Sequence, residues 1–312
     1  MFQRTHSFIN IPMLARVIGW LLLIETAFMS IPLATSIIDS CTDTMSFVIS
    51  MVITGVSGLL MTLIRPGSRE MGRREAIVLT TSVWVVFSLF GMLPFLLSGV
   101  FDSFTDAFFE SMSGFTTTGA TIIPDVEILT HGLLFWRSLT QWIGGMGIIV
   151  LSIAILPIFG LNGMQLYAAE VTGLTYEKLS PRISDTAKMM WTTYVVLTVT
   201  EILGLWLCGM PIFDAVCHSF STIATGGFST KNNSLEFYDS AAIHYLVAFY
   251  MFISGINFVI LIYLVRGKAR NFFRDEELRW YTLAVVIFAL LLTTCISNAD
   301  SHWTSWKSSC VN

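Results

Sequence analysis

Backbone carbonyl oxygens in two short threonine and glycine stretches are the groups in this sequence best suited to chemistry, because such oxygens can replace the hydration shell of a cation. The first stretch lies within Asp106–Thr121 (DAFFESMSGFTTTGAT), and the second lies within Asp214–Ser229 (DAVCHSFSTIATGGFS). A gap-free alignment shows that they are variants of one pattern, so one structural unit occurs twice. The shared pairs are Asp106/Asp214, Ala107/Ala215, Ser111/Ser219, Ser113/Ser221, Thr117/Thr225 and Gly119/Gly227.

Each motif has the features of a short helix followed by a turn. In the first copy, Ser103 or Thr105 can cap the helix, Asp106 favours its N-terminal end, and Gly114 breaks it after about Ser113. Roughly ten residues rise about 15 Å, which is half of a hydrocarbon core of ~30 Å. The helix should therefore end near the membrane centre, where the negative end of its dipole suits a desolvated cation. Extended strips should follow at Thr116 to Ala120 and at Ala224 to Phe228.

An ordinary polar loop between membrane helices is the competing interpretation of such a stretch. One copy alone would favour that interpretation. Two copies in the same register favour a pore, because polar backbone at membrane depth is tolerated only where it is buried in protein or lines a wet cavity.

The composition indicates a membrane protein. Hydrophobic residues make up 54% of the chain and charged residues only 12%, with a mean hydropathy of +0.72, whereas soluble domains have roughly 25% charged residues. Apolar stretches near 20 residues long are sufficient to cross the bilayer. We expect spans at about 14–38, 46–64, 76–98, 132–158, 187–208, 241–265 and 280–297.

The first apolar stretch could alternatively be a signal peptide, since Arg4 and Arg16 precede it and small residues follow. Its length and the presence of Glu25 favour a membrane span.

Charged residues segregate between alternate loops, which predicts the orientation. If both half-helices re-enter the membrane, the basic loops share one side, so we expect 65–75 and 266–279 to be cytoplasmic and 102–130 and 212–240 to face outward. An acidic outer mouth would favour cations over anions at the entrance. The outer acids are Asp39, Asp43, Asp102, Asp106, Glu110, Asp125, Glu127, Asp214, Glu236 and Asp239, against the single base Lys231.

Three segments resemble the TrkH/KtrB family of potassium uptake proteins, and within it the TrkH members of Trk systems. They are SGFTTTGAT (Ser113–Thr121), FWRSLTQWIGGMGIIVLSIAILP (Phe135–Pro157) and IATGGFST (Ile223–Thr230). The resemblance covers about residues 5–298 and implies an all-α, polytopic membrane protein with repeated units of helix, re-entrant pore helix and helix. It also implies that backbone carbonyls hold potassium, the transported ion, without a catalytic cofactor. By this likeness the ion ligands come from Thr117, Thr118, Gly119, Thr225, Gly226 and Gly227.

The same resemblance implies a location and partners. We expect a multi-pass protein of the bacterial inner membrane, embedded in the lipid bilayer, that forms a homodimer. A cytoplasmic nucleotide-binding regulatory subunit of the TrkA type would meet the basic inner loops. We expect no nucleic acid partner, because membrane orientation already explains the basic loops.

Members of this family carry four repeats, whereas this sequence resembles a chain truncated after two. Asn298–Asn312 (NADSHWTSWKSSCVN) has neither the half-helix nor the glycine turn expected there. We expect two N-terminal helices, a first pore repeat, a cytoplasmic connector, a second pore repeat, the start of a third repeat and an atypical tail. In this order the expected boundaries are 1–70, 71–160, 161–186, 187–266, 267–298 and 299–312.

Potassium ion transport by a channel-like uptake subunit is therefore the expected function. The alternative is a transport-incompetent membrane fragment that only associates with other helices. Natural truncation, a split gene and a frameshift all remain open as origins of the short chain. An enzyme is not expected, because the sequence contains no GxSxG, HExxH or P-loop motif and its cysteines form no CxxC pair.

Several polar residues within or beside the spans are further candidates. Glu25 and Glu201 lie inside expected spans, where a charge is costly, and a structural role is favoured for each. His218 is expected to pack behind the second filter, and Arg137 is expected to act as an outer anchor or to bond a carbonyl. The glycines Gly144, Gly145 and Gly147 are expected to permit close helix packing rather than gating.

Overall fold

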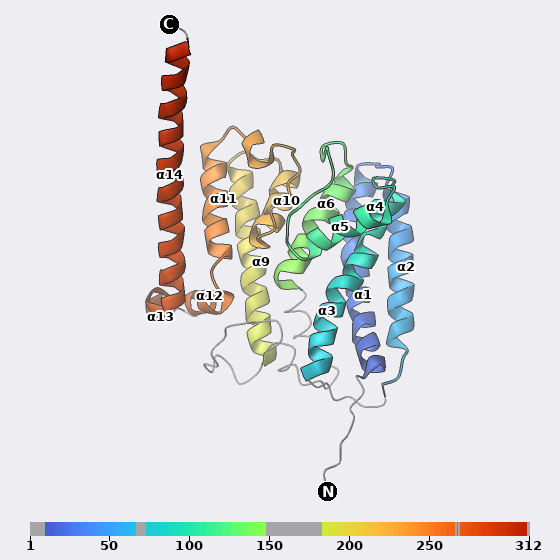
Figure 1. Cartoon of the computed structure of the whole chain (residues 1–312). Coiled ribbons are helices and arrows are strands. Elements are labelled where there is room, and N and C mark those ends of the chain that lie inside the picture. The colour runs from blue at the N-terminus through green and yellow to red at the C-terminus, as the bar shows by residue number, and fades with distance from the viewer. Residues whose placement is uncertain (1–9, 67–72, 148–182, 266, 268, 311–312) are drawn as a thin grey trace. The chain divides into compact units, whose positions relative to one another are not determined.

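The computed structural model describes residues 10–66, 73–147 and 183–310, apart from 266 and 268 (Figure 1). Within these ranges every regular element is a helix, in agreement with the expected all-α class. The chain divides into two compact units, Met1–Ser254 and Gly255–Asn312. Each unit is described by itself.

Two N-terminal helices form a hairpin at the start of the first unit. Helix α1 (Ile11–Ile38) begins at Asn10, whose side chain accepts a hydrogen bond from the Met13 amide at 3.3 Å. Helix α2 (Thr44–Thr62) follows after a short turn and packs along α1. Both helices are apolar on most sides, as expected for segments that meet lipid as well as protein.

The first pore repeat consists of α3, α4, α5, α6 and a π-helical turn η1. The expected span at 76–98 is two helices, because Pro94 at the start of α4 cannot continue the backbone hydrogen bonding of α3. Trp136 donates its indole N–H to the Gly91 carbonyl at 2.8 Å, at the end of α3. The bounds are α3 (Arg73–Gly91), α4 (Leu93–Leu97), α5 (Phe104–Phe115), α6 (His131–Trp142) and η1 (Ile143–Gly147).

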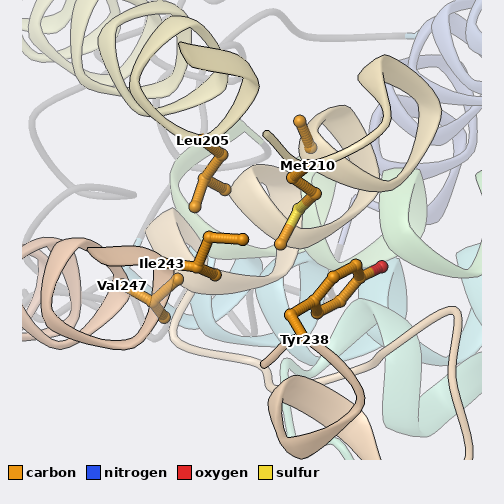
Figure 2. Close-up of a cluster of buried hydrophobic side chains, with 6 residues drawn as sticks. Leu205, Met210, Tyr238, Ile243 and Val247 are labelled. Carbon is orange, nitrogen blue, oxygen red and sulfur yellow. The ribbon is translucent and has the colours of Figure 1, made fainter. Parts of the chain in front are cut away.

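The second repeat contains α9 (Ile183–Leu207), α10 (Ile212–Ile223), the short helix η3 (Ser234–Phe237) and α11 (Ala241–Ser254). Apolar side chains from α9, α10, α11 and the connections between them form a buried cluster that holds these helices together (Figure 2). The cluster comprises Leu205, Met210, Ala215, Tyr238, Ile243 and Val247.

The second unit contains α12 (Phe258–Val265), α13 (Ala269–Arg274) and α14 (Glu276–Cys310). The expectation of one continuous span at 241–265 was wrong, since α11 ends at Ser254 and α12 begins only at Phe258. Gly255 and Asn257 lie in this interruption, and both residue types favour helix ends over helix interiors. Helix α14 extends beyond the expected span at 280–297.

Five helical stretches in the described ranges are long and apolar enough to cross a membrane, and Ala241–Ser254 is a shorter apolar helix. The five are Ile11–Ile38, Thr44–Thr62, Ile77–Leu97, Lys188–Leu207 and Glu276–Thr294. They confirm the expectation of a multi-pass membrane protein. The expected connector at 161–186 lies mostly outside the described residues, as do positions 148–158 of the fourth span. The boundaries of the expected repeats stay predictions.

Candidate functional site

The two pore helices, α5 and α10, are alike in length and position. Each has 12 residues, and their first residues, Phe104 and Ile212, occupy the same position in the alignment of the two motifs. Asp106 and Asp214 both lie in the first turn, where a carboxylate complements the positive end of the helix dipole. The expected repetition of one structural unit is therefore visible in the backbone.

Helix α5 ends in a Schellman motif. The Thr118 amide donates to the Ser113 carbonyl at 3.0 Å, and the Thr117 amide donates to the Gly114 carbonyl at 3.0 Å. Thr117 adopts the left-handed conformation with a φ of 54°, as the residue after the cap does in this motif. The backbone thereby reverses direction directly after the pore helix.

Helix α10 ends in the same way. The Gly226 amide donates to the Ser221 carbonyl at 2.8 Å, and the Thr225 amide donates to the Thr222 carbonyl at 2.9 Å. Thr225 has a φ of 56°. A left-handed threonine is rare, because its branched side chain crowds the backbone at a cost of about 1–2 kcal/mol. Its occurrence at aligned positions of both copies indicates that the surrounding structure imposes this turn twice.

The two turns touch each other through glycine. A Cβ atom on Gly119 would lie 1.8 Å from the Gly226 carbonyl oxygen, so only glycine permits this approach. Gly119 and Gly227 also have positive φ angles, 74° and 85°, which a side chain would oppose. A Cβ atom on Gly227 would meet nothing within 4 Å. The structure thus brings the two predicted filter segments together.

Exposure alternates along the second segment. Thr225 and Gly227 are exposed, whereas Ala224, Gly226 and Phe228 are buried. In the first segment Thr118 is exposed, and Thr117 and Gly119 are intermediate. One face of each strip is therefore accessible, and its backbone can present oxygen atoms there.

Arg137 on α6 connects the two copies. Its Nε donates to Glu110 on α5 at 3.0 Å, and its other nitrogens donate to the Thr121 hydroxyl and to the Ser229 carbonyl, both at 3.2 Å. The guanidinium also lies 4.2 Å from the ring centre of Phe228. The expected bond to a carbonyl is present, but Arg137 is buried within the repeat rather than an anchor at its outer edge.

Glu110 completes this network. Its carboxylate accepts hydrogen bonds from the Thr121 hydroxyl at 2.9 and 3.1 Å and from the Ile122 amide at 3.1 Å, in addition to Arg137. A buried charge requires such compensation. The ion pair therefore fixes the chain just after the first filter segment.

Three of the acids assigned to the outer mouth are internal, which corrects that expectation. Glu110 is paired as described, Asp214 accepts from the Thr230 hydroxyl at 2.7 Å, and Asp43 accepts from Ser36 at 2.6 Å and from Thr130 at 2.5 Å. All three are buried, because each holds together elements that converge at this end of the unit. The acids that can attract cations at the surface are fewer than the sequence indicated.

The loops that follow the two predicted filter segments are also joined by Asn232. Its side chain donates to Asp125 at 2.7 Å and accepts from the Val126 amide at 2.9 Å, while its own amide donates to Glu127 at 3.1 Å. Two acids and one amide of the first repeat thus bind a single residue of the second. Apart from the polarity of Asn232, no feature of the sequence indicated this contact.

The other polar residues singled out in the sequence, and two of the glycines, lie in packed surroundings. Glu25 and Glu201 are fully buried. His218 is buried, and its ring packs edge-on against Tyr238 with centroids 5.7 Å apart, so it has a packing role; its expected place behind the second filter stays a prediction. A Cβ atom on Gly144 would lie 1.9 Å from the Phe115 carbonyl oxygen, and one on Gly145 would lie 2.8 Å from the Tyr194 hydroxyl, which supports close packing.

One residue near the filter was missed by the sequence reasoning. Gln141 on α6 is fully buried, and its side-chain oxygen accepts a hydrogen bond from the Phe228 amide at 3.2 Å. The one available signal was an amide side chain within an expected membrane span.

Known proteins resemble this chain over most of its length. A family model described as "TrkH: Cation transport protein" matches residues 42–312. The Trk system potassium uptake protein TrkH of Salmonella typhimurium is 45% identical over 249 residues, which cover 77% of this chain and 52% of that protein. Its counterpart from Escherichia coli K12 is 41% identical over 290 residues, with coverages of 89% and 59%.

A solved structure shows the same fold. The crystal structure of the potassium transporter TrkH from Vibrio parahaemolyticus matches with a TM-score of 0.77 and 34% sequence identity, and the match covers 90% of this chain and 58% of that chain. The chain thus spans 52% to 59% of the length of these relatives.

Proposed function

Because this chain belongs to the TrkH family of cation transport proteins, we propose that it supplies two filter segments of a potassium pathway across the bacterial inner membrane. Potassium is the transported ion. The first segment is Thr117, Thr118 and Gly119, and the second is Thr225, Gly226 and Gly227.

One observation carries this proposal, namely the identical backbone of the two turns. In each copy a left-handed threonine follows a pore helix, and a glycine with positive φ follows two residues later. The helices end at the turns, so the negative ends of their dipoles face the same region. Carbonyl oxygens presented in this way can replace the hydration shell of an ion.

A transport-incompetent fragment that only associates with other helices is the second candidate. This candidate needs a direct test, because the chain spans only 52% and 59% of the length of the two TrkH relatives. Two filter segments provide ligands on two sides of an ion, whereas replacement of a hydration shell requires ligands on all sides. A second copy of the chain or further repeats would have to supply the others.

Growth of cells that lack potassium uptake separates these candidates. The chain would be expressed alone and joined to the last two repeats of the Escherichia coli relative, and growth would be compared at low potassium concentration. We expect growth only with the joined protein. Selective uptake by the chain alone would instead indicate a homodimer that completes the filter, and no uptake by either would refute the proposal.

We also propose a cytoplasmic nucleotide-binding partner of the TrkA type. Among the described residues, Arg270, Arg274 and Arg279 are exposed basic residues near α13, and they offer a surface for an acidic partner. Charge reversal at Arg270 and Arg274 should reduce co-purification of such a subunit. Unchanged co-purification would exclude this surface as the contact.

A further inference from the structure

Gln141 lies at the contact between the two filter turns. A Cβ atom placed on Gly226 would lie 2.3 Å from the carboxamide carbon of Gln141, 2.5 Å from its oxygen and 2.6 Å from its nitrogen. The Gln141 nitrogen also lies 3.8 Å from the Cβ position of Gly119. The carboxamide therefore occupies the space beside both turns, and it is fully buried there.

The hydrogen bond from Phe228 to Gln141 determines the orientation of a peptide plane. The Phe228 amide N–H belongs to the same peptide group as the Gly227 carbonyl, and this peptide bond is trans, as are the others described. In a trans peptide the N–H and C=O bonds point in opposite directions. Because the N–H points to Gln141 on α6, the Gly227 carbonyl points away from α6.

Gly227 is also one of the two exposed positions of this strip, the other being Thr225. Gly227 has a φ of 85°, and a Cβ atom there would meet nothing within 4 Å. A glycine with so little around it can reorient its peptide group easily. The bond to Gln141 holds this peptide group, so its loss would release the carbonyl.

The first filter segment is held by a different device. There the Ser113 hydroxyl donates to the Ala120 carbonyl at 2.5 Å. The aligned serine of the second copy, Ser221, is buried but makes no such bond. The second segment therefore depends on α6 of the first repeat. Gln141 accepts from the Phe228 amide, and Arg137, one turn earlier, donates to the Ser229 carbonyl just after the segment.

We propose that Gln141 is a positioning residue that sets ion selectivity by directing the Gly227 carbonyl toward the transported ion. The inference rests on the proposed function, because it assumes that this carbonyl is an ion ligand. Gln141 acts through the Phe228 amide and does not itself touch the ion.

Two substitutions of similar size separate positioning from packing. Gln141→Glu, in the neutral form that burial favours, keeps an oxygen that can accept from the Phe228 amide, whereas Gln141→Met fills the space without a strong acceptor. We would measure potassium and sodium uptake by the joined protein, with Ser138→Ala as a buried control on the same helix. We expect Gln141→Met to lower the preference for potassium over sodium roughly two- to tenfold, as for the loss of one hydrogen bond. Gln141→Glu and Ser138→Ala should retain most of the preference.

A second experiment tests the contact without transport. Gly226→Ala should lower the melting temperature of the purified chain, because the added Cβ meets the Gln141 carboxamide. In a Gln141→Ala background, the smaller side chain leaves space for this Cβ atom. Gly226→Ala should then lower the melting temperature by at most half as much. Additive effects of the two changes would refute the contact.

The possible failures are distinguishable. No uptake by the unmodified joined protein would overturn the proposed function and, with it, the positioning role. Normal uptake with the same ion preference in Gln141→Met and Gln141→Glu would overturn the positioning role alone.

Discussion

Arg137 and Glu110 form an ion pair with an Nε to Oε1 distance of 3.0 Å, and their side chains are only 2% and 0% exposed. The pair joins α6 to α5 beside the first filter turn. Its second set of contacts, to Ser229 and Phe228, reaches the other copy of the repeat. One guanidinium thus controls the spacing of two segments that lie far apart in the sequence.

Removal of one partner of this pair should destabilise the protein strongly. Glu110→Gln or Arg137→Met leaves a buried charge without its counter-ion, which costs about 3–5 kcal/mol. The double substitution should be less destabilising than the sum of the two single ones, because no isolated charge remains. Thermal unfolding of the purified chain in detergent would measure this coupling. Additive single and double effects would contradict the pairing.

The two filter glycines should respond differently to alanine. Gly119→Ala should impair folding, because its Cβ would lie 1.8 Å from the Gly226 oxygen. The Gly227→Ala variant should fold, since its Cβ meets nothing within 4 Å. Alanine disfavours the φ of 85° found at this position, so the preference for potassium should fall. Size-exclusion profiles and ion uptake by the joined protein would test both. Equal folding yields of the two variants would contradict the contact between the turns.

Replacement of a left-handed threonine should relieve strain. Asparagine is enriched in this conformation, so Thr225→Asn should stabilise the chain by about 1 kcal/mol if the side chain has no other role. Thr225 is exposed, which limits packing losses. The melting temperature would measure the change, with Thr200→Asn, an exposed position within α9, as the control. If Thr225→Asn instead lowered the melting temperature of the chain by as much as the control Thr200→Asn does, the turn would not be strained.

Loss of Asn232 should loosen the outer loops without unfolding the helices. Asn232→Ala removes the side-chain bonds to Asp125 and to the Val126 amide. Hydrogen exchange should accelerate at Val126 and neighbouring amides while α5 and α10 remain protected. Asn233→Ala, the exposed neighbour, is a matched control. Unchanged exchange at Val126 would mean that this bond does not order the loop.

Chemical labelling of Cys41 should report both the orientation of the chain in the membrane and the raised pKa of the Cys41 thiol. It lies in the turn between α1 and α2, and burial, followed by the nearby Asp43 carboxylate, raises the pKa of its thiol. A membrane-impermeant maleimide should therefore label a Cys41-only variant from the outside. The rate should continue to rise above pH 9, because the thiolate form appears only at higher pH than usual.

An Arg65→Cys variant that lacks Cys41 is the counterpart, since Arg65 is exposed in the loop after α2. It should be labelled only from the cytoplasmic side. Labelling of both positions from the same side would refute the proposed topology.

Much of the fold followed from the sequence because its signals are local. The spans are long apolar runs, and the pore helices carry a serine or proline before the first turn and an aspartate within it. The alignment of the two motifs also placed Gly119 and Gly227, whose positive φ angles match the expected need for glycine.

Features that depend on distant contacts could not be predicted in this way. The pairing of Arg137 with Glu110 and the three bonds at Asn232 join residues whose proximity only the packed repeats create. The left-handed Thr117 and Thr225 contradict the local preference of threonine, so sequence patterns would assign them another conformation. The break after Ser254 lies within a long apolar stretch. The high hydropathy of that stretch indicated one continuous span, although Gly255 and Asn257 favour a helix end.

The shared guanidinium of Arg137 also constrains how the two copies can diverge. Position 110 of the first copy is a glutamate that binds Arg137, whereas the aligned position of the second copy is His218, which packs on Tyr238. The duplicated units have thus become complementary halves, with a single basic group serving both. A mutation in one copy must remain compatible with the contacts made by the other copy, so the two copies are expected to evolve as one unit. Replacement of one copy by the other would remove the contact through Arg137, which neither copy can make alone.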